Sequence, residues 1–264
     1  MAQIIYLNNL PNPERKLKAG LITTSDNEDD IPHQELAVDH TSEPIRKLED
    51  IEKISNYLLS NGRYRDYMLF IVGINFGLRV SDLRQLRFCN LINNDLTFKE
   101  TFPILEIKTR NTRRNRHNRY ITINNAVIQA VTTYLEHTPG VSLNDYMFTS
   151  HSNNSLSGDE PLNRKSIYMI LKGINDDLDL GIHMSTHTLR KTFGYHQMVL
   201  GNNDPRRLLL LSRIFGHSST VITMDYIGIT YDEIEDAYKD LNLGLRKTYM
   251  DSDVVLTPEE EQAM

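Results

Sequence analysis

The sequence predicts a mainly α-helical protein with one small antiparallel β-sheet, an α+β fold class. Apolar residues recur at helical spacing along most of residues 44–230. A single pair of strand-like stretches, residues 102–109 and 120–123, flanks a polar run, which is the pattern of a β-hairpin. The 264 residues are 39% hydrophobic and 24% charged, the balance of a soluble globular protein.

Composition divides the chain into three segments. Residues 1–43 are polar and lack an apolar period, so we expect them to be disordered. Residues 44–241 form the expected globular domain, and residues 242–264 form an acidic tail. Net charge is −5 over residues 1–43, +6 over 44–230 and −7 over 231–264. The acidic total of −6 therefore conceals a basic centre that can bind an anionic partner.

Helices follow from apolar spacing and from start and stop signals. The first clear one carries Leu48, Ile51, Ile54, Leu58 and Leu59 on one face. We expect helices at about 14–21, 48–59, 65–75, a short one after Gly77, then 124–137, 163–178, 186–200, 205–214, 218–226 and 230–241. Serine and threonine favour helix N-caps, so Thr186 or Ser185 should cap the helix at 186–200, and Ser218 or Ser219 the one at 218–226.

Several classes of protein are excluded or disfavoured. A single cysteine, Cys89, rules out a disulfide scaffold and a multi-cysteine zinc site, and the nine histidines are scattered. The longest apolar run, residues 68–76, is too short to cross a bilayer, and the N-terminus lacks the layout of a signal peptide. We therefore expect a cytoplasmic protein without a membrane partner. Nucleotide-binding glycine loops, His-Glu-x-x-His and Gly-x-Ser-x-Gly are absent from the sequence.

The first chemical motif is FGLRVSDLRQL, residues 76–86. Gly77 suits a tight turn at a helix junction, and Arg79 then lies near a helix start, where an arginine beside free backbone N–H groups suits a phosphate. The alternative is a surface arginine paired with Asp82 three residues on.

The second motif is HTLRKTF, residues 187–193. His187 and Arg190 are three residues apart, so both side chains can reach one point from one helix face. The alternative is a hydrogen-bonded core histidine beside an ion-paired arginine.

The third motif is FGHSSTVITMDYIG, residues 215–228. Gly216 and His217 should end one helix, and Tyr226 follows His217 by nine residues, so one connecting turn can bring the two together. The alternative is an ordinary amphipathic tyrosine, one of 13 in the chain.

Taken in order, these three motifs resemble the signature boxes of the tyrosine recombinase, or phage integrase, family. The resemblance covers about residues 44–241, the catalytic domain of that family. It implies a mostly helical, tyrosine recombinase catalytic-domain-like fold that needs no metal, ATP or other cofactor. Lys191 stands where the family often has His, and Phe215 where it often has Leu. We expect the separate N-terminal helical domain of the family to be missing, because residues 1–43 are short and polar.

The resemblance also implies roles for individual residues in phosphoryl transfer on DNA. Tyr226 would be the nucleophile that forms a 3′-phosphotyrosine, while Arg79 and Arg190 bind the non-bridging oxygens. Lys108, on the hairpin, would be the general acid. His187 and His217 would form hydrogen bonds to the phosphate, and Asp82 would orient Arg79. His187 would also help to remove the proton of Tyr226. Tyr195 and Tyr231 lack the nine-residue spacing that marks the nucleophile.

A basic hairpin tip provides a surface for DNA. Residues 108–119 contain one lysine, five arginines and no acid, a density that suits a nucleic-acid groove. The expected DNA contacts are Arg110, Arg113, Arg114, Arg116, Arg119 and Lys191. A solvated basic loop is the alternative.

We expect double-stranded DNA as the partner, with self-association on DNA through the segment after Tyr226. An accessory protein that supplies the missing DNA-clamping domain is a further candidate partner. The resulting hypothesis is a site-specific recombinase or integrase of a mobile element. The alternative, a non-cleaving DNA-binding accessory protein of the same fold, is favoured by the missing domain and opposed by the complete set of site residues.

Overall fold

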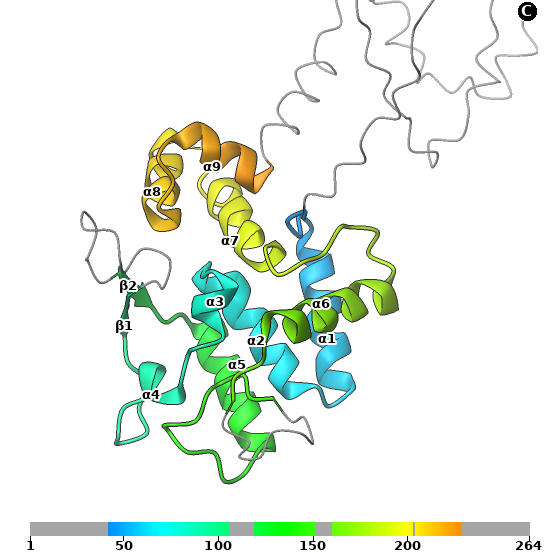
Figure 1. The fold of residues 1–264 in the computed structure, drawn as a ribbon, viewed down its shortest axis with the longest axis vertical. Coiled ribbons are helices and arrows are strands. Elements are labelled where there is room, and N and C mark those ends of the chain that lie inside the picture. The colour runs from blue at the N-terminus through cyan, green and yellow to red at the C-terminus, as the bar shows by residue number, and fades with distance from the viewer. Residues whose placement is uncertain (1–41, 106–118, 151–159, 203, 229–264) are drawn as a thin grey trace, which may run out of the picture. The chain divides into compact units, whose positions relative to one another are not determined.

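The computed structural model describes residues 42–105, 119–150, 160–202 and 204–228. Within these ranges the regular elements are helices and one two-stranded sheet, so the predicted fold class is confirmed (Figure 1). In chain order the elements are α1 Leu48–Ser60, α2 Tyr64–Phe76, α3 Val80–Leu83, α4 Phe88–Leu91, β1 Thr101–Ile104, β2 Arg119–Thr122, α5 Asn125–His137, α6 Arg164–Leu178, α7 Thr188–Val199, α8 Pro205–Phe215 and α9 Thr220–Ile227. None of the described helices is both long and apolar enough to cross a lipid bilayer.

Helix α2 forms the centre of the main hydrophobic core. Its sequence is apolar on nearly every side, and all residues from Asp66 to Gly73 are buried, so it has no face for solvent. It packs against α1, α5 and α7. Asp66, the charged residue of this stretch, forms ion pairs with Arg63 and Arg65 at 3.0 and 2.9 Å, which offsets the cost of burying its carboxylate.

Helices α7, α8 and α9, yellow to orange in Figure 1, share a second and smaller core. Its buried members are Met198, Leu211, Phe215 and Ile227. Gly194 on α7 permits this packing, since a Cβ there would lie 2.5 Å from Cγ2 of Ile227 and 3.0 Å from the ring of Phe215. The end of α9, which carries Tyr226, is therefore held close to α7.

Strands β1 and β2 pair antiparallel, with Thr101 opposite Thr122 and Ile104 opposite Arg119. This register confirms the predicted hairpin, whose connecting segment lies outside the described residues. The strand expected over residues 102–109 is observed as Thr101–Ile104, and that expected over 120–123 as Arg119–Thr122.

The structure corrects three local expectations. The helix expected at 186–200 begins at Thr188, with His187 rather than Thr186 or Ser185 in the cap position. The Ser185 hydroxyl accepts a hydrogen bond from the His187 N–H, which belongs to the turn before the helix. Leu48 is 65% exposed although its spacing matched the apolar face of α1. Helix α4 was not predicted, because four residues are too few to show a helical period.

Other start signals are confirmed. The hydroxyl of Ser219 accepts a hydrogen bond from the N–H of Ile222 and so caps α9, as expected. The helices expected at 14–21 and 230–241 lie outside the described residues.

Candidate active site

The turn after α2 places Arg79. Gly77 ends the helix in the left-handed region, with φ of 57°, and a Cβ at this position would lie 2.4 Å from the Phe193 ring on α7. Glycine is required on both counts. Arg79 then becomes the residue before α3, so its side chain starts from the junction between the main core and α7.

Two arginines from distant parts of the chain converge on one carbonyl group. Nη2 of Arg79 and Nη2 of Arg190 each donate to the carbonyl oxygen of Phe215 at 3.0 Å, and Nη1 of Arg190 donates to that of Gly77 at 2.6 Å. Arg190 is only 3% exposed, so these main-chain contacts compensate for burying its guanidinium. Two planar cations held this close can bind the oxygens of one phosphate group.

The side chains of Tyr226 and His187 are in contact beside these two arginines. The hydroxyl of Tyr226 lies 3.2 Å from Nδ1 of His187, across 39 residues of sequence. Partial burial lowers the pKa of His187, and the positive charges of Arg164, Lys191, Arg190 and Arg79 lower it further. A neutral imidazole can accept a proton from the Tyr226 hydroxyl. This contact favours a role for His187 in proton transfer over the alternative of a histidine that only packs in the core.

Two opposing effects act on the pKa of Tyr226. Burial raises the pKa of Tyr226, whereas the nearby charges of Arg190 and Arg79 and a hydrogen bond from Arg190 lower it. Burial is the larger effect, so the free protein keeps this hydroxyl protonated at neutral pH. A proton acceptor is therefore needed before the oxygen can act as a nucleophile.

His217 is oriented by a threonine. Its Nδ1 lies 3.0 Å from the hydroxyl oxygen of Thr223, which is fully buried and lies 3.3 Å from the carbonyl oxygen of Ser219. The His217 ring also packs edge-on against Tyr226, with centroids 5.2 Å apart. Thr223 was not predicted as a site residue, because a small hydroxyl residue between His217 and Tyr226 is a weak signal in the sequence.

Phe215 joins these residues. Its fully buried ring lies 4.3 Å beneath the guanidinium of Arg190 and packs against Tyr226 and His217 at centroid distances of 5.5 and 5.4 Å. The position noted only for its departure from leucine therefore contacts most of the site.

Two of the expected DNA contacts are directed at the protein itself. Lys191 is 5% exposed, and its ammonium lies 5.3 Å from the centre of the Tyr226 ring. Both Nη atoms of Arg119 donate to main-chain carbonyls, those of Ile214 and Phe76, at 3.1 Å. The contact of these two side chains with DNA stays a prediction.

The remaining expected site residues are distributed as follows. Asp82 is 3% exposed and accepts a hydrogen bond from the Ser81 hydroxyl, so its orienting role on Arg79 stays a prediction. Tyr195 lies on α7 beside Arg46. Expected residues outside the described ranges are Lys108, Arg110, Arg113, Arg114, Arg116 and Tyr231.

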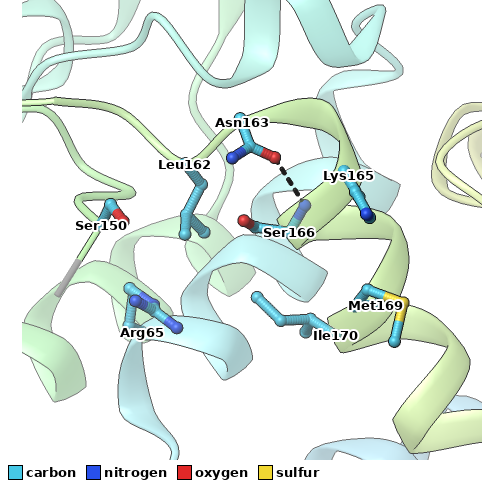
Figure 2. Close-up of a pocket in the computed structure, with 8 residues that line it drawn as sticks. All are labelled: Arg65, Ser150, Leu162, Asn163, Lys165, Ser166, Met169 and Ile170. Carbon is cyan, nitrogen blue, oxygen red and sulfur yellow. Dashed lines mark hydrogen bonds between the residues drawn. The ribbon is translucent and has the colours of Figure 1, made fainter. Parts of the chain in front are cut away.

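A cavity of about 500 Å³ lies beside the start of α6. Figure 2 shows its lining, where Asn163 accepts a hydrogen bond from the Ser166 N–H, with Arg65 and Lys165 on other sides. It contains none of the expected site residues. In the described parts of the chain, no group of three His, Cys, Asp or Glu side chains is arranged to hold a metal ion.

Residues 46–233 match the model of the phage integrase family. The chain is 36% identical over 200 residues to the probable integrase/recombinase YoeC of Bacillus subtilis (strain 168), covering 76% of this chain and 97% of that protein. It is 24% identical over 216 residues to the tyrosine recombinase XerC of Halalkalibacterium halodurans, covering 76% of this chain and 64% of that protein.

Solved structures agree with the fold. The XerH site-specific recombinase, crystallised with a palindromic difH substrate as a post-cleavage complex, superimposes with a TM-score of 0.52 at 17% identity. The match covers 75% of this chain and 53% of that one. A mostly helical fold of this kind, the ordered motifs and the match over residues 46–233 lead to one conclusion: the chain belongs to the phage integrase family, the tyrosine recombinases.

Proposed function

We propose that this protein cuts and rejoins double-stranded DNA through a covalent bond between Tyr226 and the 3′-phosphate. The observation that carries the proposal is the 3.2 Å approach of the Tyr226 hydroxyl to His187, beside the paired guanidiniums of Arg79 and Arg190. A nucleophile, a neutral base and a cationic phosphate site are the three parts that phosphoryl transfer to a tyrosine requires.

The reaction would run in two balanced steps. The Tyr226 oxygen attacks phosphorus as its proton passes to His187, and the bond from phosphorus to the 5′-oxygen breaks. Arg79 and Arg190 hold the charge on the non-bridging oxygens, and His217 donates a hydrogen bond to one of them. In the second step a 5′-hydroxyl attacks the phosphotyrosine and gives its proton to Lys108, while the bond from phosphorus to the Tyr226 oxygen breaks and His187 returns its proton to that oxygen. The phosphodiester energy is kept in the covalent bond, so rejoining needs no ATP.

Protonation of the leaving 5′-oxygen is assigned to Lys108. This role rests on the family resemblance and on the place of Lys108 in the segment that connects β1 and β2. An ammonium group beside a departing alkoxide supplies the proton that the leaving group needs. Lys191, buried beside the Tyr226 ring, adds positive charge at the other end of the reacting bond.

The partner we propose is double-stranded DNA, bound through the basic segment 108–119. The XerH recombinase is crystallised on its difH substrate, which supports this class of partner. Self-association on DNA through the segment after Tyr226, and an accessory protein that adds a second DNA-clamping surface, belong to the same proposal.

A covalent trapping assay tests the proposal. Nicked duplexes drawn from DNA flanking the gene are mixed with the protein, denatured in SDS and examined for a protein–DNA band, whose peptide is mapped by mass spectrometry. We expect a band that maps to Tyr226, its loss in Tyr226→Phe, and its retention in the matched control Tyr195→Phe. Specific binding by the wild type without any band would contradict cleavage and favour a non-cleaving accessory protein.

A further inference from the structure

The ends of α2 and α8 face each other across the site. Each helix terminates in a left-handed glycine, Gly77 with φ of 57° and Gly216 with φ of 64°. The last carbonyl groups of a helix lack partners within the helix and carry its negative partial charge. Two such ends close together would repel unless cations lie between them.

Three arginines occupy that position. Arg190 joins the Gly77 carbonyl to that of Phe215, and Arg79 also donates to Phe215. Arg119 joins the carbonyls one residue earlier in each helix, those of Phe76 and Ile214, with both contacts at 3.1 Å. Arg119 and Arg190 thus make parallel bridges between the same two helix ends.

Arg119 differs from the other two in where it starts. It is the first residue of β2, directly after the segment that contains Lys108. Its guanidinium is half-buried and directed at protein carbonyls, so its charge is used in bridging the helices. An arginine fork suits two separate acceptors in a way that a single ammonium nitrogen does not.

We propose that Arg119 is a positioning residue, which bridges α2 and α8 and so holds the Phe215 carbonyl, the Gly216–His217 turn and the two phosphate-binding arginines in register. This inference rests on the proposed function for its effect on cleavage. Loss of the bridge would let the end of α8 shift, and displacements near 1 Å at a reacting centre cost about 10²-fold in rate.

The test compares Arg119→Met and Arg119→Lys with two references. Arg113→Met reports what loss of an expected DNA contact does, and Lys172→Met removes an exposed charge that forms a surface ion pair with Asp176 at 2.9 Å on α6. Circular dichroism and thermal melting identify the variants that fold. If Arg119→Met does not fold, Arg119→Lys carries the comparison.

We expect Arg119→Met to lower the rate of single-turnover cleavage at saturating DNA about 10²-fold, while the affinity for DNA and its salt dependence stay within twofold of wild type. The cleavage rate of Arg119→Lys should lie between those of the wild type and Arg119→Met. Arg113→Met should instead weaken binding and reduce the salt slope by about 1. An Arg119 variant that behaves like Arg113→Met would overturn the proposal in favour of a DNA contact.

Amide hydrogen exchange separates this inference from the proposed function. The N–H groups of Gly216 and His217 bond to carbonyls of Arg213 and Ser212 at the end of α8. We expect their exchange in Arg119→Met to quicken about tenfold while that of α5 is unchanged. Unchanged exchange at these amides would overturn the bridge even if cleavage fell. A wild-type protein that never cleaves would remove the proposed function and leave the exchange result to decide the bridge.

Discussion

The two hydrophobic clusters of this protein differ in size and in what they position. The main core surrounds α2 and extends over α1 and α5, whereas the smaller one has Met198, Leu211, Phe215 and Ile227 as its buried members. The main core provides Arg79 through the turn at Gly77. The smaller cluster provides His217 and Tyr226.

This difference indicates a division of labour between the two clusters, in which the main core positions Arg79 and the smaller cluster positions His217 and Tyr226. A few contacts hold the tyrosine region, so it has less apolar burial to resist local opening than α2 has. The arginine-to-carbonyl bonds connect the two clusters, since Arg79, Arg119 and Arg190 all reach carbonyls at the end of α8. We expect Arg79 to be held as rigidly as the main core and the nucleophile Tyr226 to be more mobile.

The largest effect should come from breaking the connection itself. Arg190→Met removes donors from the carbonyls of Gly77 and Phe215 and one phosphate ligand. Cleavage should fall at least about 10³-fold, and the free energy of unfolding by about 2–3 kcal/mol. Single-turnover cleavage and urea unfolding measure the two effects, with Lys172→Met as control. A variant with wild-type stability would show that the bridges do not hold the clusters together.

A pair of truncations compares the clusters directly. Phe70 and Phe215 are both buried, at 1% and 0% exposed, but they lie in different clusters. Phe70→Ala should lower the free energy of global unfolding by about 3–5 kcal/mol. Phe215→Ala should cost less globally, yet speed amide exchange in α9 and lower cleavage. Equal effects on global unfolding and on exchange would contradict the division of labour.

The base is tested by pH. His187 has a pKa below its ordinary value of 6.5, so it is neutral at pH 7 and gains a proton only in more acidic solution. Cleavage should therefore be flat near neutrality and fall as pH drops through that lowered pKa, because the imidazolium cannot accept the proton of Tyr226. His187→Asn should lower the rate about 10²-fold and abolish this acid limb.

Two outcomes would contradict the role of His187. An acid limb that persists in His187→Asn would assign the titration to another group. The pH dependence of stability is an independent test of the lowered pKa. As pH falls, His187 of the unfolded chain binds a proton near pH 6.5, whereas His187 of the folded chain binds one only at lower pH. The His187 contribution should thus lower the free energy of unfolding as pH falls below 6.5, and His187→Asn should lack it.

The smallest effect concerns the orientation of His217. The Thr223 hydroxyl has one proton, which can go to the Ser219 carbonyl or to Nδ1 of His217. When it goes to Nδ1, the proton of a neutral His217 lies on Nε2, which can then donate to the phosphate. Thr223→Val keeps the shape and removes this hydrogen-bond partner of Nδ1, so cleavage should fall about tenfold or less, with DNA affinity unchanged. Thr223→Ser should restore most of the rate. Equal rates in the valine and serine variants would exclude the hydroxyl.

Much of the site could be predicted from short-range pattern. Gly77 at a helix end, the three-residue spacing of His187 and Arg190, and Ser219 as a cap all rest on local geometry, which neighbours in sequence determine. The hairpin was predictable because a strand on each side of a polar run leaves few other arrangements.

What escaped prediction depends on contacts between distant segments. Arg119 and Lys191 look like surface cations in the sequence, yet one bridges two helix ends and the other is buried beside Tyr226. Phe215 drew attention only as a substitution for leucine, and its contacts with Arg190, His217 and Tyr226 require three helices to pack together.

The family, the fold class and the candidate residues for the chemistry follow from the sequence alone, because helical periods, turn glycines and ordered motifs are local properties of a chain. Which charges face solvent and which are buried could be seen only in the folded molecule. Burial depends on packing between segments more than a hundred residues apart, as where Arg79 reaches Phe215. That same packing sets the opposing influences on the pKa of Tyr226 and makes His187 its neutral partner.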